Sequence, residues 1–345
     1  MFAEYLQKVT SGDDLSEKEM EKAMDAIMSG EVSDTRLAGF LTGLKVKGET
    51  AEEITGAARA MRDKALPLNI EDDVIDTCGT GGDSSDTFNI STAVSFVLAG
   101  GGMMVAKHGN RSVSSQSGSA DVLEALGAEL ELPPARVKEC LKEAGIGFLF
   151  APVFHKAMKH ASTVRSELGI RTIFNILGPL TNPARAEYQL LGVYSEKLVE
   201  PMINTLKQLG LKSAMVVHGA GGMDELSLAG KNIIGFFEEG KEIKFSEISP
   251  QDAGLKRAEA AALKGGGPQE NSSIILSILA GRDRGPRRDV ILFNAGAALK
   301  IAGEAATFAE GTEMAGDIID SGRALASLEK FVARTRTLSS AEAIS

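Results

Sequence analysis

Residues 74–92 read VIDTCGTGGDSSDTFNIST, a short apolar run followed by a glycine-rich turn and then by a helical pattern. The glycines allow a tight turn with converging N–H groups, and a helix beginning near residues 89–92 adds the positive end of its dipole. The segment therefore predicts a strand, a phosphate-binding turn and a helix. It is not a Walker loop, because no Gly-Lys-Ser/Thr follows, and the glycines alone fit a plain tight turn equally well.

Similar apolar runs alternate with helical patterns further along the chain. The runs MMVA, LLGVY and SAMVVH have the length and composition of strands, and a helix is expected over residues 198–209. This alternation predicts an α/β fold with a mainly parallel sheet. Ligands of such sheets bind at the carboxyl ends of the strands, so we expect the functional site in the loops after Thr77, Ala106 and His218.

The first 68 residues show only helical patterns, two of them preceded by capping boxes of the form S/T-x-x-E. They predict a small helical unit, followed by a linker over residues 65–73. Gly39 and Gly43 lie four residues apart on one helix, which indicates a close helix contact. That contact could lie within the unit or between two subunits.

The composition is that of an ordinary globular protein with an acidic surface. Lys and Arg number 37 against 47 Asp and Glu, which gives a net charge of −10 and disfavours binding to nucleic acid or anionic membranes. Cys78 and Cys140 match neither a disulfide framework nor a zinc site, so we expect a reduced, cytoplasmic setting. Apolar stretches fall short of the roughly 18 residues that a membrane span needs, and no secretory signal is evident.

The loop at residues 107–119 reads KHGNRSVSSQSGS and combines two cations with five serines and an asparagine. These side chains offer positive charge and many hydrogen-bond donors to an oxygen-rich ligand. A solvated connection would also explain the serines, but less readily Lys107, which follows a buried strand. His108 could be a structural histidine, and we give it no catalytic role.

The loop after the third strand, residues 219–223, leads to the adjacent carboxylates Asp224 and Glu225. Two neighbouring carboxylates on a glycine-rich loop suit a hard cation such as Mg²⁺, which would bridge to phosphates. An acidic pair taken alone is usually solvated surface. Three such loops at one sheet edge favour the magnesium and phosphate interpretation.

Several long motifs resemble a known family. The segments CGTGGD, NIST, KHGNRSVSSQSGSADVLEALG, VRSELGIRTIFNILGPLTNP, GGMDELSL and GPRRDVILFNAGAALKIAG are similar to those of the anthranilate phosphoribosyltransferases, and the similarity spans nearly the whole chain. Gln116 departs from the lysine that many relatives have at this place.

This resemblance implies an architecture shared with pyrimidine nucleoside phosphorylases and class III phosphoribosyltransferases. A small α-helical domain would comprise residues 1–68 with about 165–185, and a large α/β domain residues 72–164 with about 186–345. The helical domain would join two chains into a homodimer. The implied reaction transfers the phosphoribosyl group of 5-phosphoribosyl 1-pyrophosphate to the amine of anthranilate in tryptophan biosynthesis, giving N-(5-phosphoribosyl)anthranilate and pyrophosphate.

The resemblance also implies roles for individual residues. Ser91, Asp224 and Glu225 would hold two Mg²⁺ ions per active site, and Gly79, Asn110 and Arg165 would contact anthranilate. No general base is identified, and Lys107 would act electrostatically. The phosphoribosyl donor would be bound by Gly79, Gly82, Asp83, Thr87, Asn89, Ile90, Ser91, Thr92, Lys107, His108, Gly109, Asn110, Arg111, Ser112, Val113, Ser114, Ser115 and Ser119.

Two alternative functions use the same architecture. A pyrimidine nucleoside phosphorylase-like enzyme would carry a glycine-rich signature after Lys-His, whereas Asn110, Arg111 and Ser112 follow Lys107-His108-Gly109 here. A non-catalytic, nucleic-acid-binding relative would need a basic groove, which the net charge of −10 disfavours.

Overall fold

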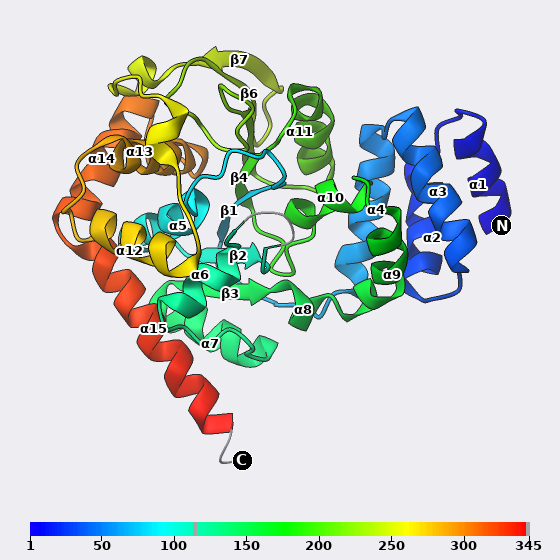
Figure 1. Cartoon of the computed structure of the whole chain (residues 1–345), viewed down its shortest axis with the longest axis horizontal. Coiled ribbons are helices and arrows are strands. Elements are labelled where there is room, and N and C mark those ends of the chain that lie inside the picture. Colours follow the sequence, from blue (N-terminus) through cyan, green and yellow to red (C-terminus); the bar gives the residue numbers. More distant parts are fainter. Residues whose placement is uncertain (113–115, 343–345) are drawn as a thin grey trace.

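The structure is a computed structural model that describes residues 1–112 and 116–342. A cluster of helices lies at one end of the molecule, and an α/β part forms the rest (Figure 1). Within the described residues, no helix is both long and apolar enough to cross a membrane.

The helical cluster combines the N-terminal helices with a segment from the middle of the chain (Figure 1). Both expected capping boxes are present, at Ser16 with Glu19 and at Thr50 with Glu53, and they satisfy the first N–H groups of two helices. The members of the cluster are α1 (Phe2–Thr10), α2 (Glu17–Met28), α3 (Asp34–Lys47), α4 (Ala51–Lys64), α9 (Lys159–Leu168) and α10 (Phe174–Leu177).

Glycines set how closely these helices cross. A Cβ atom on Gly43 would lie 3.0 Å from Cγ2 of Val9, and one on Gly39 would lie 3.4 Å from Cδ1 of Leu6. The close contact expected for Gly39 and Gly43 is therefore made inside the cluster, between α3 and α1. The tightest crossing is at Gly56 of α4, where a Cβ atom would overlap the backbone carbonyl of Glu17.

The core of the helical cluster extends into the α/β part. Buried side chains of α9 and α10 share it with Leu191 and Val216 from the sheet and with Met202 from α11 (Val199–Gln208). Because one apolar core crosses from one part to the other, packing alone draws no sharp boundary between them. The division into residues 1–68 with 165–185 and the remainder stays a prediction.

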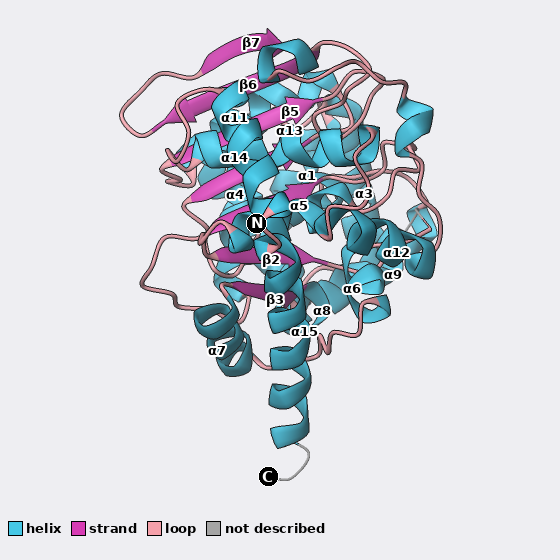
Figure 2. Ribbon diagram, turned by 90° about the vertical axis from the view of Figure 1, so that its left-hand side faces the viewer, coloured by secondary structure: helices cyan, strands magenta, loops and turns pink. Residues whose placement is uncertain are grey.

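One sheet of seven strands, in the order β3-β2-β1-β4-β5-β6-β7, runs through the described α/β part (Figure 2). β1 to β5 pair in parallel, and β6 and β7 add an antiparallel edge, so the expectation of a mainly parallel sheet is confirmed. The strands are β1 (Ile75–Gly79), β2 (Val105–Gly109), β3 (Ile146–Phe150), β4 (Tyr188–Gly192), β5 (Ser213–His218), β6 (Asn232–Glu238) and β7 (Lys244–Ile248).

A second, larger core lies between the sheet and the remaining helices. α5 and α13 are apolar around most of their circumference, because both are buried between the sheet and outer helices. Besides α11, the helices of this part are α5 (Ile90–Gly100), α6 (Ser119–Ala125), α7 (Pro134–Ala144), α8 (Ala151–Phe154), α12 (Pro268–Leu279), α13 (Pro286–Ile301), α14 (Phe308–Asp320) and α15 (Arg323–Glu342).

Two helical glycines predict opposite effects of the same substitution. Gly56→Ala should destabilise the protein by about 1–3 kcal/mol, because the added methyl group overpacks the crossing of α4 with α2. Gly316→Ala should stabilise it by about 0.5–1 kcal/mol, because a Cβ atom there meets only Nη2 of Arg288 at 3.6 Å and alanine favours the helix. Urea unfolding of both variants measures this, and equal effects would contradict the assigned crossing.

Candidate active site

Two of the three expected loops are joined directly at the carboxyl edge of the sheet. The Gly81 N–H, in the loop after β1, donates to Oδ2 of Asp224 at 2.7 Å. The Asp224 N–H in turn donates to Oδ2 of Asp83 at 3.3 Å. The loop after β5 therefore closes over the glycine-rich turn after β1.

The close approach of Asp224 depends on two glycines at strand ends. A Cβ atom on Gly79 of β1 would lie 2.7 Å from Cγ of Asp224 and closer still to Oδ2. A Cβ atom on Gly192 of β4 would overlap the backbone carbonyl of Asp224. Gly79, expected to make room for a ligand, instead makes room for a carboxylate of the protein.

Glu225 and Lys107 complete the floor of the site. The Ser91 N–H, in the first turn of α5, donates to Oε1 of Glu225 at 3.2 Å. Nζ of Lys107 donates to the backbone oxygen of Thr77 at 2.6 Å and to Oγ of Ser91 at 3.2 Å. Lys107 lies within β2 and is 2% exposed, so it contacts Ser91 from the buried side of the site.

Burial makes this cluster electrostatically unfavourable. It raises the pKa of Asp224 to about 7, with repulsion from Asp83 as the next cause. Burial, followed by repulsion from Asp224, raises the pKa of Glu225 to about 8. Burial lowers the pKa of Lys107, against the attraction of Asp76. A bound cation would relieve the repulsion between these carboxylates.

The oxygens present suit Mg²⁺ better than a metal that needs a cage of protein ligands. Two carboxylates and the hydroxyl of Ser91 are hard ligands. In the part of the chain that the structure describes, no group of three or more His, Cys, Asp or Glu side chains forms a metal site. Mg²⁺ commonly binds through one or two carboxylates and takes its other oxygens from water and substrate phosphates.

The glycine-rich turn presents backbone donors beside these carboxylates. Gly81 and Gly82 have φ values of +67° and +73°, which glycine adopts without strain. Within the described residues, the N–H groups of Gly82, Asp83 and Ser84 have no hydrogen-bond partner. Successive free N–H groups next to the N-terminus of α5 fit a phosphate-bearing ligand.

The loop after β2 is held in part by a carboxylate of α6. The guanidinium of Arg111 forms a bidentate ion pair with Glu124 and lies 5.3 Å from the centre of the Phe150 ring. The backbone oxygen of Asn110 accepts hydrogen bonds from Ala120 N–H and from Oγ of Ser119. Arg111 is thus committed to a protein carboxylate in this structure. The predicted donor contacts of Val113, Ser114 and Ser115 lie outside the described residues.

Sequence reasoning missed one residue that ties three loops together. Asn271, at 1% exposure in the first turn of α12, donates through Nδ2 to Oδ1 of Asn89 at 2.9 Å. Its Oδ1 accepts from the Gly266 N–H at 2.8 Å, and Nδ2 of Asn89 donates to the oxygen of Ser117 at 3.0 Å. The signal available in the sequence was the triple glycine at residues 265–267 ahead of a helix.

Thr87 lies in the same region, paired by an isolated β-bridge with Lys264 next to that triple glycine. Ile90 and Thr92 are buried in the first turn of α5, so their side chains pack inward. Gly109 ends β2, where a Cβ atom would overlap Oγ of Ser119.

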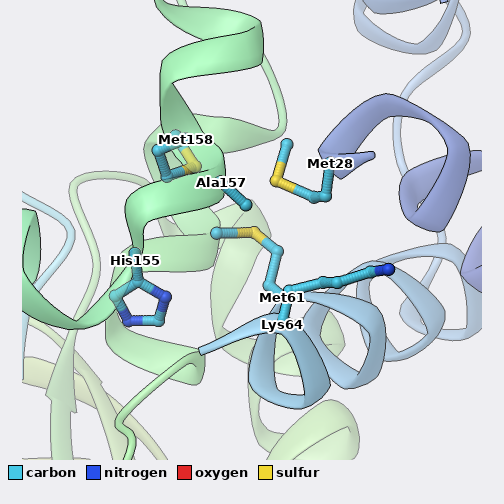
Figure 3. A pocket seen from close by; sticks show the side chains of 6 residues that line it. All are labelled: Met28, Met61, Lys64, His155, Ala157 and Met158. Carbon is cyan, nitrogen blue, oxygen red and sulfur yellow. The ribbon is translucent and has the colours of Figure 1, made fainter. Parts of the chain in front are cut away.

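His108 and His155 form a buried pair between the sheet and the helical cluster. Their rings lie 5.1 Å apart, and both Nε2 atoms are buried without a partner in the described residues. Burial lowers their pKa values to about 3 and about 4, so both imidazoles are neutral at pH 7. Beyond His155, a shallow apolar hollow is lined by Met28, Met61 and Met158 (Figure 3).

Arg165 lies on α9, in the helical cluster, and is half-buried. Its guanidinium is 5.2 Å from the centre of the Phe174 ring, and burial lowers its pKa. No ion pair of Arg165 is found in the described residues. Within the same residues, no hydrogen bond joins any two of the three residues expected to contact anthranilate, Gly79, Asn110 and Arg165.

Comparison with known proteins agrees with both parts of the fold. Residues 71–325 match the α/β domain of a glycosyl transferase family, and residues 3–65 match the helical bundle domain of such a family. The anthranilate phosphoribosyltransferase of Petrotoga mobilis is 56% identical over 340 residues, which cover 98% of each chain. The chain belongs to the anthranilate phosphoribosyltransferase family.

Solved structures of anthranilate phosphoribosyltransferases superpose on nearly the whole chain. The enzyme of Thermus thermophilus has a TM-score of 0.91 at 47% identity and covers 96% of this chain and 99% of its own. The enzyme of Saccharomyces cerevisiae, in complex with PRPP and Mg, has a TM-score of 0.89 at 30% identity and covers 97% and 98%. Neither alternative function is favoured by these similarities.

Replacing the acidic pair should separate activity from stability. Asp224→Asn combined with Glu225→Gln keeps the shape of both side chains but removes their charge. We expect loss of most magnesium-dependent turnover together with a gain of about 0.5–2 kcal/mol in the free energy of unfolding without metal, because repulsion is relieved. Turnover at limiting Mg²⁺ and urea unfolding are the measurements. Unchanged turnover would contradict the assignment of this pair as metal ligands. A large loss of stability would show instead that the pair stabilises the fold.

Proposed function

We propose that this protein transfers the 5-phosphoribosyl group from 5-phosphoribosyl 1-pyrophosphate to the amine of anthranilate. The products are N-(5-phosphoribosyl)anthranilate and pyrophosphate, in a magnesium-dependent step of tryptophan biosynthesis. The observation that carries the proposal is the row of free N–H groups at Gly82, Asp83 and Ser84 beside Asp224 and Glu225. This juxtaposition supplies both halves of a site for a metal-bound pyrophosphate.

The proposed donor site lies at the carboxyl ends of β1, β2 and β5. Ser91, Asp224 and Glu225 would hold two Mg²⁺ ions, which supply positive charge next to the pyrophosphate when bound. The backbone of the turn after β1 and the first turn of α5 would bind phosphate oxygens. The side chains of Ile90 and Thr92 are buried and Arg111 is paired with Glu124, so we assign these three no direct side-chain contact with the donor.

Lys107 acts through its charge and through Ser91. Its ammonium group donates to Oγ of Ser91 and so holds that oxygen in place as a ligand for the cation. The same positive charge offsets part of the repulsion around Glu225. Lys107 thereby favours the charged form of Glu225 against the effect of burial.

The reaction needs little acid–base chemistry from the protein. The aryl amine of anthranilate is neutral at pH 7 and can attack C1 of the ribose with its lone pair, while the bond from C1 to the pyrophosphate oxygen breaks. The arylammonium that forms is acidic and loses its proton to water. Charge then builds on the leaving pyrophosphate, where the N–H groups of the turn after β1 are aimed in advance. Positioning and electrostatic stabilisation supply most of the rate enhancement.

The proposed acceptor site lies on the side of the helical cluster. Arg165 would pair with the carboxylate of anthranilate, because its guanidinium is half-buried against Phe174 and its N–H groups have no carboxylate partner in the described residues. Gly79 and Asn110 would border the same space. We further propose a cytoplasmic homodimer joined through the helical cluster.

Loss of anthranilate fluorescence on addition of 5-phosphoribosyl 1-pyrophosphate and Mg²⁺ tests the proposed reaction. We expect the loss only when all three components and the protein are present. Phosphate-dependent cleavage of a pyrimidine nucleoside without anthranilate turnover would favour the phosphorylase instead. Salt-dependent retention on DNA without any turnover would favour the nucleic-acid-binding relative.

Arg165→Ala should weaken recognition of anthranilate alone. Loss of a charge-assisted contact worth about 1.5–3 kcal/mol should raise the KM for anthranilate about ten- to a hundredfold and leave donor affinity nearly unchanged. Steady-state kinetics with each substrate varied in turn provides the measurement. Aniline, which lacks the carboxylate, is the control and should lose little further in the variant. Equal losses for anthranilate and aniline would make Arg165 a structural residue.

A further inference from the structure

Arg171 lies between α9 and α10, on the segment that returns to the helical cluster, yet its side chain contacts the glycine-rich turn after β1. Nη2 of Arg171 donates to the backbone oxygen of Gly82, and its guanidinium lies 4.4 Å from the centre of the Tyr194 ring. The side chain is exposed, and the described residues contain no carboxylate in ion-pair contact with it. The charged group of this exposed arginine is thus hydrogen-bonded to a backbone carbonyl instead of a carboxylate.

The aromatic ring beneath Arg171 is fixed to the same turn. The Tyr194 N–H donates to Oγ1 of Thr80 at 3.2 Å, and the Thr80 N–H donates to the oxygen of Gly192 at 2.9 Å. A Cβ atom on Gly82 would lie 3.4 Å from Nη2 of Arg171, so the guanidinium lies flat against this glycine. Arg171 therefore joins three segments: the return segment, the turn after β1 and the residues after β4.

The hydrogen bond from Arg171 sets the direction of one free donor. The carbonyl of Gly82 and the N–H of Asp83 belong to one planar trans peptide, in which they point in opposite directions. Because the guanidinium holds the carbonyl, the Asp83 N–H is aimed away from Arg171, and it has no partner in the described residues. A charged donor on the carbonyl also polarises the peptide and strengthens its N–H as a donor.

We propose that Arg171 is a positioning residue that holds the turn at residues 79–83 in the shape that binds the phosphoribosyl donor. The inference rests on the proposed donor site at this turn. Because Gly81 and Gly82 can adopt many backbone conformations, the turn without Arg171 would have to become ordered when the donor binds. The cost of that ordering would weaken donor binding. Through this residue the return segment of the helical cluster contributes to donor affinity without touching the donor.

Calorimetric titration with 5-phosphoribosyl 1-pyrophosphate and Mg²⁺, without anthranilate, tests the proposal on the full chain. Arg171→Ala should bind the donor about five- to tenfold more weakly, which corresponds to about 1 kcal/mol for one exposed charged hydrogen bond. Tyr194→Leu should show a similar loss, whereas Tyr194→Phe keeps the ring and should bind normally. Arg282→Ala is the matched control, since this exposed arginine makes no side-chain hydrogen bond or ion pair in the described residues.

The double variant Arg171→Ala with Tyr194→Leu distinguishes positioning from direct contact. If Arg171 acts through the turn, the double variant should bind the donor no more weakly than either single variant. Additive losses would show that Arg171 touches the donor and would overturn the proposal, as would unchanged donor affinity in Arg171→Ala. Arg171→Lys keeps the charge but not the planar stack, and wild-type affinity in that variant would also overturn it.

Failure of the proposed function gives a different result from failure of this inference. If the wild type binds the donor but does not turn over anthranilate, the proposed function fails while the effect of Arg171 on donor binding can still be measured. If the wild type turns over anthranilate and Arg171→Ala binds the donor normally, only the role of Arg171 fails. Melting temperatures of all variants, expected within a few degrees of the wild type, exclude general unfolding as the cause.

Discussion

The presence of two adjacent carboxylates, Asp224 and Glu225, at the carboxyl edge of the sheet is the constraint on which the rest of the site depends. Glycines are required at the ends of β1 and β4 because any side chain there would strike Asp224. Each of the two carboxylates is stabilised by a backbone N–H donor, one from the turn after β1 and one from α5. Lys107 beneath them supplies the compensating charge. The same few contacts therefore fix the strand ends and hold the carboxylates of the site.

This arrangement costs stability that the two large cores must offset. Carboxyl groups whose pKa values are raised to about 7 and 8 are held in an environment that disfavours their charged form. Sites of this kind exchange stability for function, because the repulsion that destabilises the free protein favours binding of a cation. The core shared by the helical cluster, β4, β5 and α11 supplies part of the stability that offsets this repulsion.

Local sequence patterns predicted the elements of this fold but not the partners of individual side chains. Alternating apolar runs and capping boxes identify strands and helices because their causes lie within a few residues of the chain. The pairing of Arg111 with Glu124, the bridge made by Asn271 and the contact of Arg171 with Gly82 depend on the assembled fold. The sequence places Gly79 in a predicted phosphate-binding turn, but the reason for a glycine there is the approach of Asp224 from 145 residues away, which has no local signature.

An anomalous difference map from crystals grown with 5-phosphoribosyl 1-pyrophosphate and Mn²⁺ tests the central assignment most directly, because Mn²⁺ takes the same oxygen ligands as Mg²⁺ and scatters anomalously. The account predicts a peak in contact with carboxylate oxygens of Asp224 or Glu225, with the donor phosphates on its other side. A donor whose metal touches only phosphate and water, with Asp224 still on the Gly81 N–H and Glu225 on the Ser91 N–H, would contradict it.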